Sequence, residues 1–328
     1  PAEAAARAQG VPVEALGAGS KWEKFRSVRR WLRTFRPEVI HGVMKRASSL
    51  AVLANLPAQR CRVVGTDMST ASYARHKPDL WAALLLYAFT DAVVTQTEMN
   101  RRNLARLAPW LARRIQVIRN GVDTERFRPA EGGRTAGPFR FVCVGTVYRV
   151  KNPVRVVEAA ALLAQREAGD FCLEWYGRPG LSADGLPSEE FQRAQALVRS
   201  LGLEKRVRFM GPRHDIETVY RQADTLVHAS LQEGTPNAVV EAMASGLPVV
   251  VSRVSDLPLI VETARNGFVC DATDPAAIAD AMERLLRTPP AERVAMGRRS
   301  RELAERWFGP ERFVAEFETL YASLLGRP

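Results

Sequence analysis

The chain has 328 residues, enough for two domain cores, and its longest apolar run, Trp81 to Phe89, is far shorter than the roughly 20 residues that a membrane-spanning helix needs. Its four cysteines lack the spacing of a zinc site and no secretion leader opens the sequence, so we expect a globular protein of a reduced, cytoplasmic compartment. The net charge of +11 comes from the first half, because residues 1–137 hold 23 Lys and Arg against 11 Asp and Glu, whereas the remainder holds 24 against 25.

The basic first half has several interpretations. It suits a surface for anionic lipid head groups, for an anionic glycan or for nucleic acid, whereas solvated arginines scattered over the surface would give the same count. No RNA-binding aromatic motif and no metal finger accompanies the charge, so we expect no nucleic-acid partner. An anionic membrane surface stays open as a partner, and with it a peripheral position at the inner membrane leaflet.

The N-terminal part predicts two helices. Residues 1–18 are typical of a helix, a turn at Gly10 and a strand near Val11 to Leu16. In Lys21 to Phe35, apolar side chains recur at helical spacing with basic residues between them. We expect this amphipathic helix to pack on a sheet, and a helix on a membrane surface is the alternative. Its apolar positions are Trp22, Phe25, Val28, Trp31, Leu32 and Phe35.

Strands and helices then alternate up to a Gly-rich linker. The expected strands are Val39–His41, Arg62–Thr66, Ala92–Thr95 and Ile115–Ile118, and the expected helices are Ser48–Leu56, Leu80–Ala88 and Glu98–Ala108. Such alternation without hairpin signals predicts a parallel sheet. The run EGGRTAGP, Glu131 to Pro138, has the composition of a linker and marks the expected domain boundary.

The second half repeats this alternation. The expected strands are Phe139–Val144, Cys172–Tyr176, Val207–Met210, Leu226–Ala229, Val249–Val251 and Phe268–Cys270. The expected helices are Pro153–Gln165, Phe191–Leu201, Glu217–Ala223, Pro275–Leu286 and a C-terminal pair that Gly309 and Pro310 separate. Gly145 and Lys151 follow the first of these strands, at the edge where doubly wound α/β folds bind phosphate.

The second half is organised around Thr225 to Ser252, which predicts a strand, a loop, a helix and a second strand. Thr235 is a good N-cap, Pro236 suits the first helical position, and Gly246 followed by Pro248 ends the helix. Free amide groups and the helix dipole favour an anion at such a helix start. The residues of this predicted phosphate site are Gly234, Thr235, Pro236, Asn237 and Ala238.

Two carboxylates bracket the phosphate site, Glu233 in the loop and Glu241 in the helix. Helical side chains lean toward the N-terminus, so Glu241 can reach a group bound at the loop. Carboxylates accept hydrogen bonds from hydroxyls, so the combination suits a sugar nucleotide, with phosphates on amides and sugars on carboxylates. The competing interpretation from spacing alone is that both glutamates are solvated.

The run EGTPNAVVEAMASGLPVV, Glu233 to Val250, closely resembles the signature of glycosyltransferase family 4, the group 1 retaining transferases of GT-B fold. The turn RNGVDTERFRP, Arg119 to Pro129, resembles a second hallmark of this family, and the resemblance extends from about Ala4 to Leu325. It implies an α/β fold of GT-B type, with two facing Rossmann-like domains that have parallel sheets and hold the ligand in the crevice between them.

The resemblance also implies a division into domains. Residues 1–133 would form an acceptor-side domain that the C-terminal helix 310–328 completes, and residues 134–309 would bind the nucleotide sugar. The family's first strand and Gly-rich loop usually precede the part that corresponds to the start of this sequence, so we expect a truncated N-terminal domain.

Roles follow from the same resemblance. Lys151 matches the family's lysine on the donor diphosphate, with Arg149 as its companion cation. Glu233 would hold hydroxyls of the donor sugar, and Glu241 would hold the ribose. Gly145, Gly177 and Arg213 complete the expected nucleotide site, Arg213 in a turn that resembles the family's base-binding turn.

The sequence departs from the family pattern at three places. Thr146 stands where the family has an arginine, and Arg149 is the nearest substitute. If Arg149 does not replace it, stabilisation of the leaving group should be weaker by one charge-assisted contact, about 1.5 to 3 kcal/mol. The run VVGTDMST lacks the family's histidine near the donor sugar, and Leu259 replaces the glutamate of a Pro-Glu pair.

We therefore expect a retaining glycosyltransferase that moves a sugar from a UDP- or GDP-sugar donor to a hydroxyl of a glycan or lipid-linked acceptor, in polysaccharide or glycolipid synthesis. Fixed cations and amides would meet the charge on the departing phosphate and no Asp-x-Asp motif occurs, so neither a metal nor a cofactor is expected. The alternatives are a non-catalytic nucleotide-binding remnant and a sugar-nucleotide epimerase or sugar phosphorylase of the same architecture.

Overall fold

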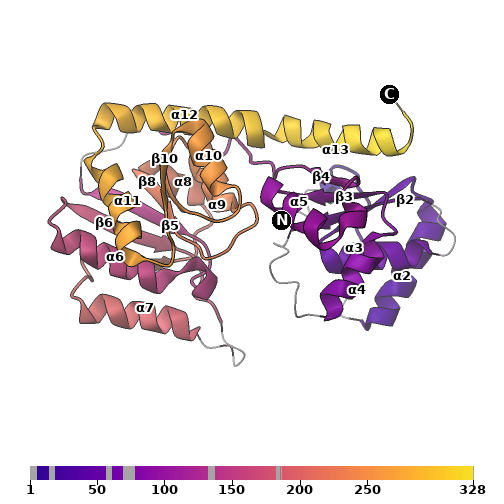
Figure 1. Ribbon diagram of the computed structural model, residues 1–328, viewed down its shortest axis with the longest axis horizontal. Coiled ribbons are helices and arrows are strands. Elements are labelled where there is room, and N and C mark those ends of the chain that lie inside the picture. Colours follow the sequence, from indigo (N-terminus) through magenta and orange to yellow (C-terminus); the bar gives the residue numbers. More distant parts are fainter. Residues whose placement is uncertain are drawn as a thin grey trace. The chain divides into compact units, whose positions relative to one another are not determined.

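The computed structural model describes residues 6–14, 19–56, 61–68, 78–131, 137–181, 185 and 187–327. The chain forms two compact units, each with its own sheet (Figure 1). Unit 1 comprises Pro1–Thr95, Asn103–Gln116 and Leu320–Pro328, and unit 2 comprises Gln96–Arg102 and Val117–Thr319. Most of the predicted linker, residues 132–136, lies outside the described residues, and the predicted domain boundary stays a prediction.

Unit 1 is built on a four-stranded sheet in the order β1-β2-β3-β4. Its strands are β1 (Val39–Val43), β2 (Arg62–Asp67), β3 (Ala92–Thr95) and β4 (Ile115–Val117). Strand β2 is parallel to both β1 and β3, as the alternation of strands and helices predicted. The predicted strand near Val11 is wrong over residues 11–14, which have no regular structure, and residues 15–18 lie outside the described part.

The helices α2 (Lys21–Phe35), α3 (Lys45–Asn55), α4 (Pro78–Tyr87), α5 (Glu98–Leu107) and the 3-10 helix η2 (Pro109–Leu111) connect these strands or flank them. Tyr87 and Leu111 are fully buried in the main core of unit 1, and Val52 and Val63 pack in a smaller one. Helix α3 packs on both β1 and β2, so it covers one face of the sheet.

Helix α2 has the predicted bounds because both of its ends are determined locally. The Ser20 hydroxyl accepts a hydrogen bond from the amide of Glu23 at 3.2 Å, and the Glu23 carboxylate accepts one from the amide of Ser20 at 2.6 Å, which is a capping box. Arg36, in the left-handed conformation at φ 44°, ends the helix. The helix packs mainly against α3 and not on the sheet as expected, and only Leu32 of its apolar residues is buried.

Unit 2 contains a six-stranded parallel sheet in the order β10-β9-β8-β5-β6-β7. The strands are β5 (Phe139–Val144), β6 (Phe171–Tyr176), β7 (Val207–Gly211), β8 (Thr225–His228), β9 (Val249–Ser252) and β10 (Gly267–Cys270). The chain builds the sheet outward from β5 to β7, then returns to the other side of β5 and continues to β10. This is the strand order of a Rossmann fold, and the order reverses between β5 and β8.

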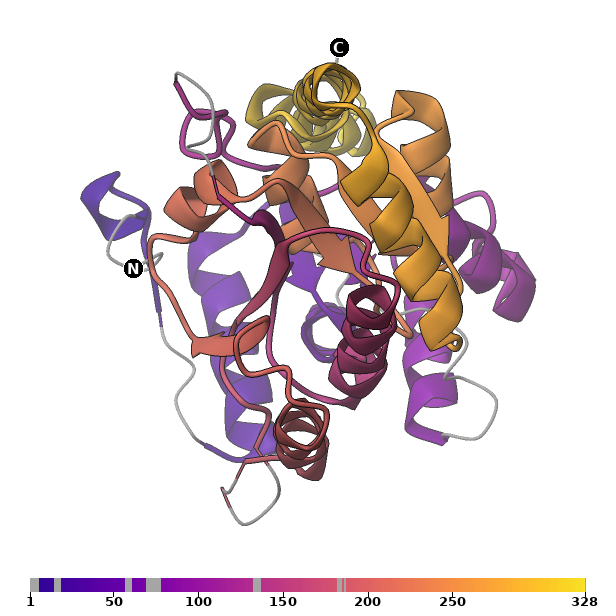
Figure 2. The same cartoon turned by 90° about the vertical axis from the view of Figure 1, so that its left-hand side faces the viewer.

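Helices cover both faces of this sheet (Figures 1 and 2). Phe139, Phe141 and Cys143 of β5 belong to one core, with α6, α7 and α11, while Val142 points into the other, with α8, α9, α10 and α12. A central parallel strand buried on both faces therefore reads as an unbroken apolar run. The helix bounds are α6 (Pro153–Gln165), α7 (Glu189–Ser200), α8 (Ile216–Gln222), α9 (Asn237–Ala244), α10 (Leu257–Ala264), α11 (Pro275–Arg287), α12 (Pro290–Phe308) and α13 (Pro310–Leu324).

Helix α9 and helix α10 differ from their predictions. Helix α9 begins at Asn237 with Pro236 as its N-cap, one residue later than Thr235 and Pro236 predicted, because Thr235 Oγ1 donates to the carbonyl of Gln96 at 3.2 Å instead of capping the helix. Helix α10 has no predicted counterpart, and Pro258 lies in its first turn, where a missing amide costs nothing. No helix in the described ranges is long and apolar enough to cross a bilayer.

Candidate functional site

The candidate site lies in unit 2 where strands β5 and β8 are neighbours and their connections leave in opposite directions. At such a switch point the carboxyl ends of two parallel strands open a crevice that the adjacent connections do not cover. The loop that begins at Gly145 follows β5, and the loop from Ala229 to Pro236 follows β8. The predicted donor-binding residues lie largely on these two loops.

The ends of β5 and β6 approach each other so closely that one of them needs glycine. A Cβ atom on Gly177 would lie 2.0 Å from the carbonyl oxygen of Gly145. Gly145 has φ +137°, its amide donates to the carbonyl of Tyr176 at 2.9 Å, and its carbonyl accepts from Trp175 Nε1 at 2.9 Å. The predicted pair Gly145 and Gly177 therefore lies side by side at the phosphate edge of the sheet.

A buried asparagine turns the β5 loop toward β8. The chain leaves β5 through the 3-10 helix η3 (Arg149–Lys151) and reaches Asn152, which has φ 64°. Asn152 Nδ2 donates to the carbonyls of Ala229 at 3.0 Å and Ala272 at 2.7 Å, so one amide group joins the loops after three strands. Lys151 is thereby held against the loop that carries Glu233.

Lys151, Glu233 and His228 form a buried cluster. Glu233 Oε1 accepts from Lys151 Nζ at 2.5 Å and lies 2.8 Å from His228 Nε2. The exposed side-chain fractions are 18% for Lys151, 12% for Glu233 and 3% for His228. Burial by itself would raise the pKa of Glu233, but the hydrogen bond from His228 and the positive charge of Lys151 outweigh it and lower the pKa to about 2. Glu233 is therefore ionised at neutral pH.

His228 is neutral at physiological pH. Burial lowers the pKa of its imidazole, and the adjacent Lys151 charge acts in the same direction, so the opposing effect of Glu233 does not restore the ordinary value. A neutral ring next to an ionised carboxylate carries its hydrogen on Nε2, so this N–H donates a hydrogen bond to Glu233. Ser230 Oγ lies 3.1 Å from the same nitrogen. His228 was not among the predicted site residues, although a histidine at the carboxyl end of a buried strand is a visible signal in the sequence.

The residues that follow Glu233 lead into α9, and several of their backbone amides are unpaired within the described part of the chain. No described residue accepts a hydrogen bond from the backbone amides of Gly234, Thr235, Asn237 or Ala238. The Asn237 side chain accepts from Asn120 Nδ2 at 3.1 Å, and Asn120 Oδ1 accepts from Gln96 Nε2 at 2.5 Å. The Asn-Gly turn, Asn120 and Gly121, thus contacts the helix start through Asn120, and the unpaired backbone amides there can bind an anion.

Glu241 belongs to a second cluster, which includes Tyr220 of α8. Tyr220 donates its hydroxyl hydrogen to Glu241 Oε2 at 3.1 Å. Burial raises the pKa of Glu241, although the Tyr220 hydrogen bond and the charge of Arg126 oppose the shift. Arg126 itself binds Glu217 at 2.9 Å. Glu241 is therefore a half-buried carboxylate held by one neutral donor, a suitable acceptor for a further hydroxyl.

Two predicted cations, Arg149 and Arg213, do not belong to these clusters. Arg149 is exposed, and no residue in the described ranges binds its guanidinium. Arg213 is also exposed and forms a two-armed pair with Asp215, at 2.8 and 2.5 Å. Both residues lie after the expected strands, β5 and β7, but the structure joins neither to Lys151.

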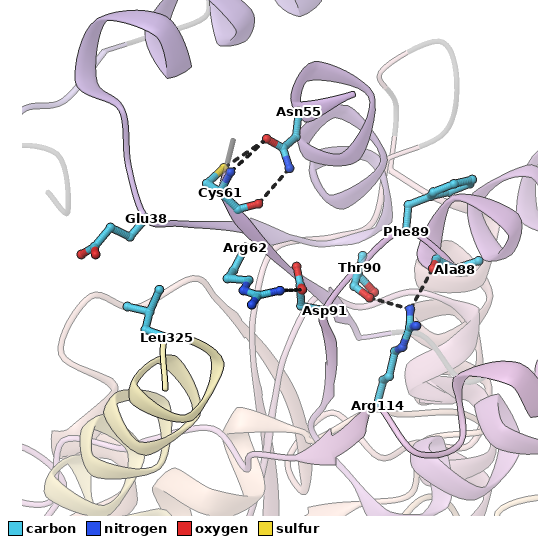
Figure 3. A pocket seen from close by; sticks show the side chains of 10 residues that line it. All are labelled: Glu38, Asn55, Cys61, Arg62, Ala88, Phe89, Thr90, Asp91, Arg114 and Leu325. Carbon is cyan, nitrogen blue, oxygen red and sulfur yellow. Dashed lines mark hydrogen bonds and ion pairs between the residues drawn. The ribbon is translucent and has the colours of Figure 1, made fainter. Parts of the chain in front are cut away.

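A polar pocket of about 570 Å³ lies in unit 1, where the amino ends of its strands meet (Figure 3). Its charged groups already have partners: Arg62 pairs with Asp91 at 2.9 Å, Glu38 pairs with Arg327 at 2.7 Å, and Arg114 donates to the carbonyls of Ala88 and Thr90. Figure 3 shows the bonds of Arg62 and Arg114 lining the pocket wall. The pocket therefore carries structural polar groups and none of the predicted site residues.

The carboxyl edge of the unit 1 sheet holds a separate group of polar side chains. His41 lies 2.8 Å from the Tyr321 hydroxyl and 2.6 Å from Thr66 Oγ1. Burial lowers the pKa of His41. Asp67, in the run where the sequence departs from the family resemblance, is buried at the end of β2. The segment that follows, residues 69–77, lies outside the described residues.

Comparison with known proteins gives two adjoining family matches. Residues 138–288 match the family described as Glycosyl transferases group 1, and residues 6–126 match the one described as Glycosyltransferase Family 4. The D-inositol 3-phosphate glycosyltransferase of Corynebacterium kroppenstedtii is 31% identical over 69% of this chain and 52% of its own length. That of Salinispora tropica is 28% identical over 86% of this chain and 57% of its own length. The chain thus spans about half the length of the curated relatives it matches.

Solved structures share the fold. HepE of Anabaena, in complex with UDP, has a TM-score of 0.85 at 18% identity and covers 98% of this chain and 89% of its own. Sucrose-phosphate synthase of Thermosynechococcus elongatus has a TM-score of 0.75 at 21% identity, over 93% of this chain and 78% of its own. This likeness, together with the two Rossmann-like halves, confirms the predicted GT-B fold class.

Proposed function

Because the chain belongs to the group 1 glycosyltransferases of glycosyltransferase family 4, we propose that it transfers a sugar from a nucleoside diphosphate donor to an acceptor hydroxyl. The observation that carries this proposal is the cluster at the β5/β8 switch point, where Lys151 and Glu233 lie 2.5 Å apart beside free amides of the α9 start. A cation and free amides suit a diphosphate, and carboxylates suit the attached sugars.

The donor is proposed to be a UDP-sugar. Solved structures of HepE contain UDP, UDP with glucose, and UDP-glucose, and their fold matches this chain with TM-scores of 0.83 to 0.85. Lys151 and the α9 amides would then bind the diphosphate, Glu233 the donor sugar, and Glu241 the ribose. Arg149, which is exposed, would be available for the phosphate, and Arg213, which is exposed but paired with Asp215, would lie near the base.

The chemistry proposed is transfer with retention of the anomeric configuration, as the family resemblance implies. The developing charge on the leaving diphosphate is met by Lys151 and by the fixed amide dipoles of α9, which need no reorganisation during the reaction. These groups supply the charge stabilisation that a metal ion provides in other transferases, so we propose a metal-independent reaction. Turnover that survives a chelator such as EDTA supports this, and turnover that stops with EDTA and returns with Mg²⁺ or Mn²⁺ opposes it.

Titration with UDP and UDP-glucose tests the donor site. Both are expected to bind and to raise the melting temperature. Replacing Glu241 by alanine should weaken UDP binding about 10- to 100-fold, the effect of one hydrogen bond to a charged group, about 1.5 to 3 kcal/mol. Glu262→Ala, the same change at an exposed position of α10, should leave the affinity unchanged. Equal UDP affinity for Glu241→Ala and the unmodified protein would show that Glu241 does not bind the nucleotide. Absence of any nucleotide binding would contradict the proposed function.

The acceptor is proposed to be a glycan or lipid-linked hydroxyl at an anionic membrane surface. Helix α2 carries six Lys and Arg and one Glu over Lys21–Phe35, and it leaves Trp22 64% and Phe35 51% exposed. Trp22 stacks on Phe25 with ring centroids 5.1 Å apart, so the two rings form one aromatic surface near the start of the helix. A basic helix with exposed aromatic residues suits the interface of an anionic bilayer.

Binding to vesicles tests this surface. The protein is expected to bind phosphatidylglycerol vesicles at low salt and to dissociate as salt screens the basic residues. Trp22→Ala should weaken binding several-fold because an exposed aromatic side chain no longer enters the interface. Trp110→Ala removes a similarly exposed tryptophan, at 47%, from η2 and should have no effect. Equal loss in both variants, or no vesicle binding at low salt, contradicts the assignment of α2.

A further inference from the structure

We propose that His228 is the positioning residue of the donor site: it keeps Glu233 in place while Lys151 passes from Glu233 to the donor diphosphate. The inference deepens the proposed function and rests on it. It starts from the observation that one oxygen, Glu233 Oε1, is bound by two donors, the ammonium of Lys151 at 2.5 Å and the imidazole of His228 at 2.8 Å.

The two donors differ in how freely they can leave. Lys151 ends a 3-10 helix in a surface loop, and its side chain is a flexible chain with three N–H donors. His228 is the last residue of β8, lies opposite Val251 in the register with β9, and is buried. A ligand in the crevice can therefore attract the ammonium, whereas the imidazole cannot follow without disturbing the sheet.

A diphosphate changes the partner of Lys151. It carries more negative charge than one carboxylate, and the free amides of Gly234, Thr235, Asn237 and Ala238 can hold it near the loop. When the ammonium turns toward the phosphate, Glu233 loses one of its two partners inside a largely buried site. A buried carboxylate without a partner is strongly disfavoured, so a second donor that stays in place is required for Glu233 to remain there as an anion.

His228 meets this requirement because it donates as a neutral ring. Its Nε2–H binds Glu233 Oε1, so no charge has to be brought into the site. None of the described residues donates to the second carboxylate oxygen, Glu233 Oε2. That oxygen is left to accept from a hydroxyl of the donor sugar, at an angle that the His228 bond determines.

Different residues of the site act on the donor sugar and on the diphosphate. Lys151 and the amides act on the diphosphate that UDP and UDP-glucose share, whereas His228 acts through Glu233 on the sugar that only UDP-glucose carries. Loss of His228 should therefore leave binding of UDP nearly unchanged and reduce the advantage of UDP-glucose over UDP. A role in folding alone would weaken both equally.

The experiment measures dissociation constants of UDP and UDP-glucose, together with kcat and KM, for the unmodified protein, His228→Leu and His228→Gln. In His228→Leu the preference for UDP-glucose over UDP is expected to fall by about tenfold or more, the loss of one charge-assisted hydrogen bond. His228→Gln keeps an N–H near the position of Nε2 and should recover much of that preference. An unchanged preference in His228→Leu, or equal loss for UDP and UDP-glucose, overturns the inference.

A second variant keeps the inference testable if His228→Leu folds poorly. Glu233→Gln removes the anion that competes for Lys151, so UDP should bind as well as before or better while the preference for UDP-glucose falls. Adding His228→Gln to Glu233→Gln should change nothing more, because the two residues act on one interaction. Fully additive effects overturn the inference. Failure of the unmodified protein to bind either nucleotide refutes the proposed function itself, which distinguishes the two results.

Discussion

Lys151→Ala is expected to lower kcat/KM for the sugar nucleotide about 100- to 1,000-fold, the cost of removing one fixed donor from a developing negative charge. Lys151 is the only cation that the described part of the chain brings into direct contact with Glu233 at the switch point. Without it the departing diphosphate keeps only the α9 amides and the exposed Arg149, and kcat should fall together with the affinity for UDP. Steady-state kinetics with UDP-glucose and titration with UDP measure the two effects.

The control for this variant is Lys205→Ala, which removes an exposed lysine from the loop before β7 and should leave kcat/KM unchanged. Acid stability offers an independent check. The pKa of Glu233 is about 2 in the folded chain against an ordinary value of 4.5, so its ionised form contributes stability that is present above about pH 4.5 and lost as the pH falls toward 2. In Lys151→Ala the pKa of Glu233 should lie closer to 4.5, so this loss should be smaller and should be complete at a higher pH. A variant with unaltered kcat/KM would mean that Lys151 does not face the leaving group.

Gly177→Ala is expected to destabilise unit 2 by about 3 kcal/mol or more, because the added methyl group would lie 2.0 Å from the carbonyl oxygen of Gly145. Both atoms in conflict belong to or are fixed by the backbone, so no side chain can move aside. The ends of β5 and β6 must separate, which also displaces the loop that carries Lys151. For a unit of this size the melting temperature should fall by about 6 to 12 °C, as differential scanning calorimetry measures, and UDP binding should weaken.

The matched control is Gly202→Ala. A methyl group there meets no atom within 4 Å, but φ is +63°, so the cost should be about 1 kcal/mol of backbone strain alone. UDP affinity should not change, because Gly202 follows α7, far along the chain from both loops of the site. If the two substitutions lowered the melting temperature by the same amount, close packing of the strand ends would not be the reason for glycine at residue 177.

Several elements could be predicted because their signals are local. The bounds of α2, β5 and α6 agree with the sequence prediction, since a capping serine, an apolar run buried on both faces and a proline at the first helical position determine them. Where a tertiary contact competes, the prediction shifts or fails. Thr235 binds the Gln96 carbonyl instead of capping α9, and Pro258 lies in the first turn of α10 although proline equally favours a loop.

The candidate site shows the same division. Lys151, Glu233 and Glu241 were predicted from motif and spacing, whereas His228 and Asn152 were not. The role of these two polar residues depends on which residues of other loops they contact. The amphipathic pattern of α2 likewise predicts a packed face, but the helix packs mainly against α3 and Trp22 stays exposed. Burial of a side chain depends on the neighbouring elements, and these are distant in sequence.

The sequence by itself determined the alternation of strands and helices, the family, and the chemical groups that the loops after β5 and β8 carry. Only the tertiary structure decided which of these groups meet. Lys151 and Glu233 are 82 residues apart, and they touch because β8 returns to pair with β5 after two intervening strands. Strand order depends on the packing of whole helices and sheets, so the contact that places a cation, a carboxylate and a neutral histidine at one oxygen has no local signal.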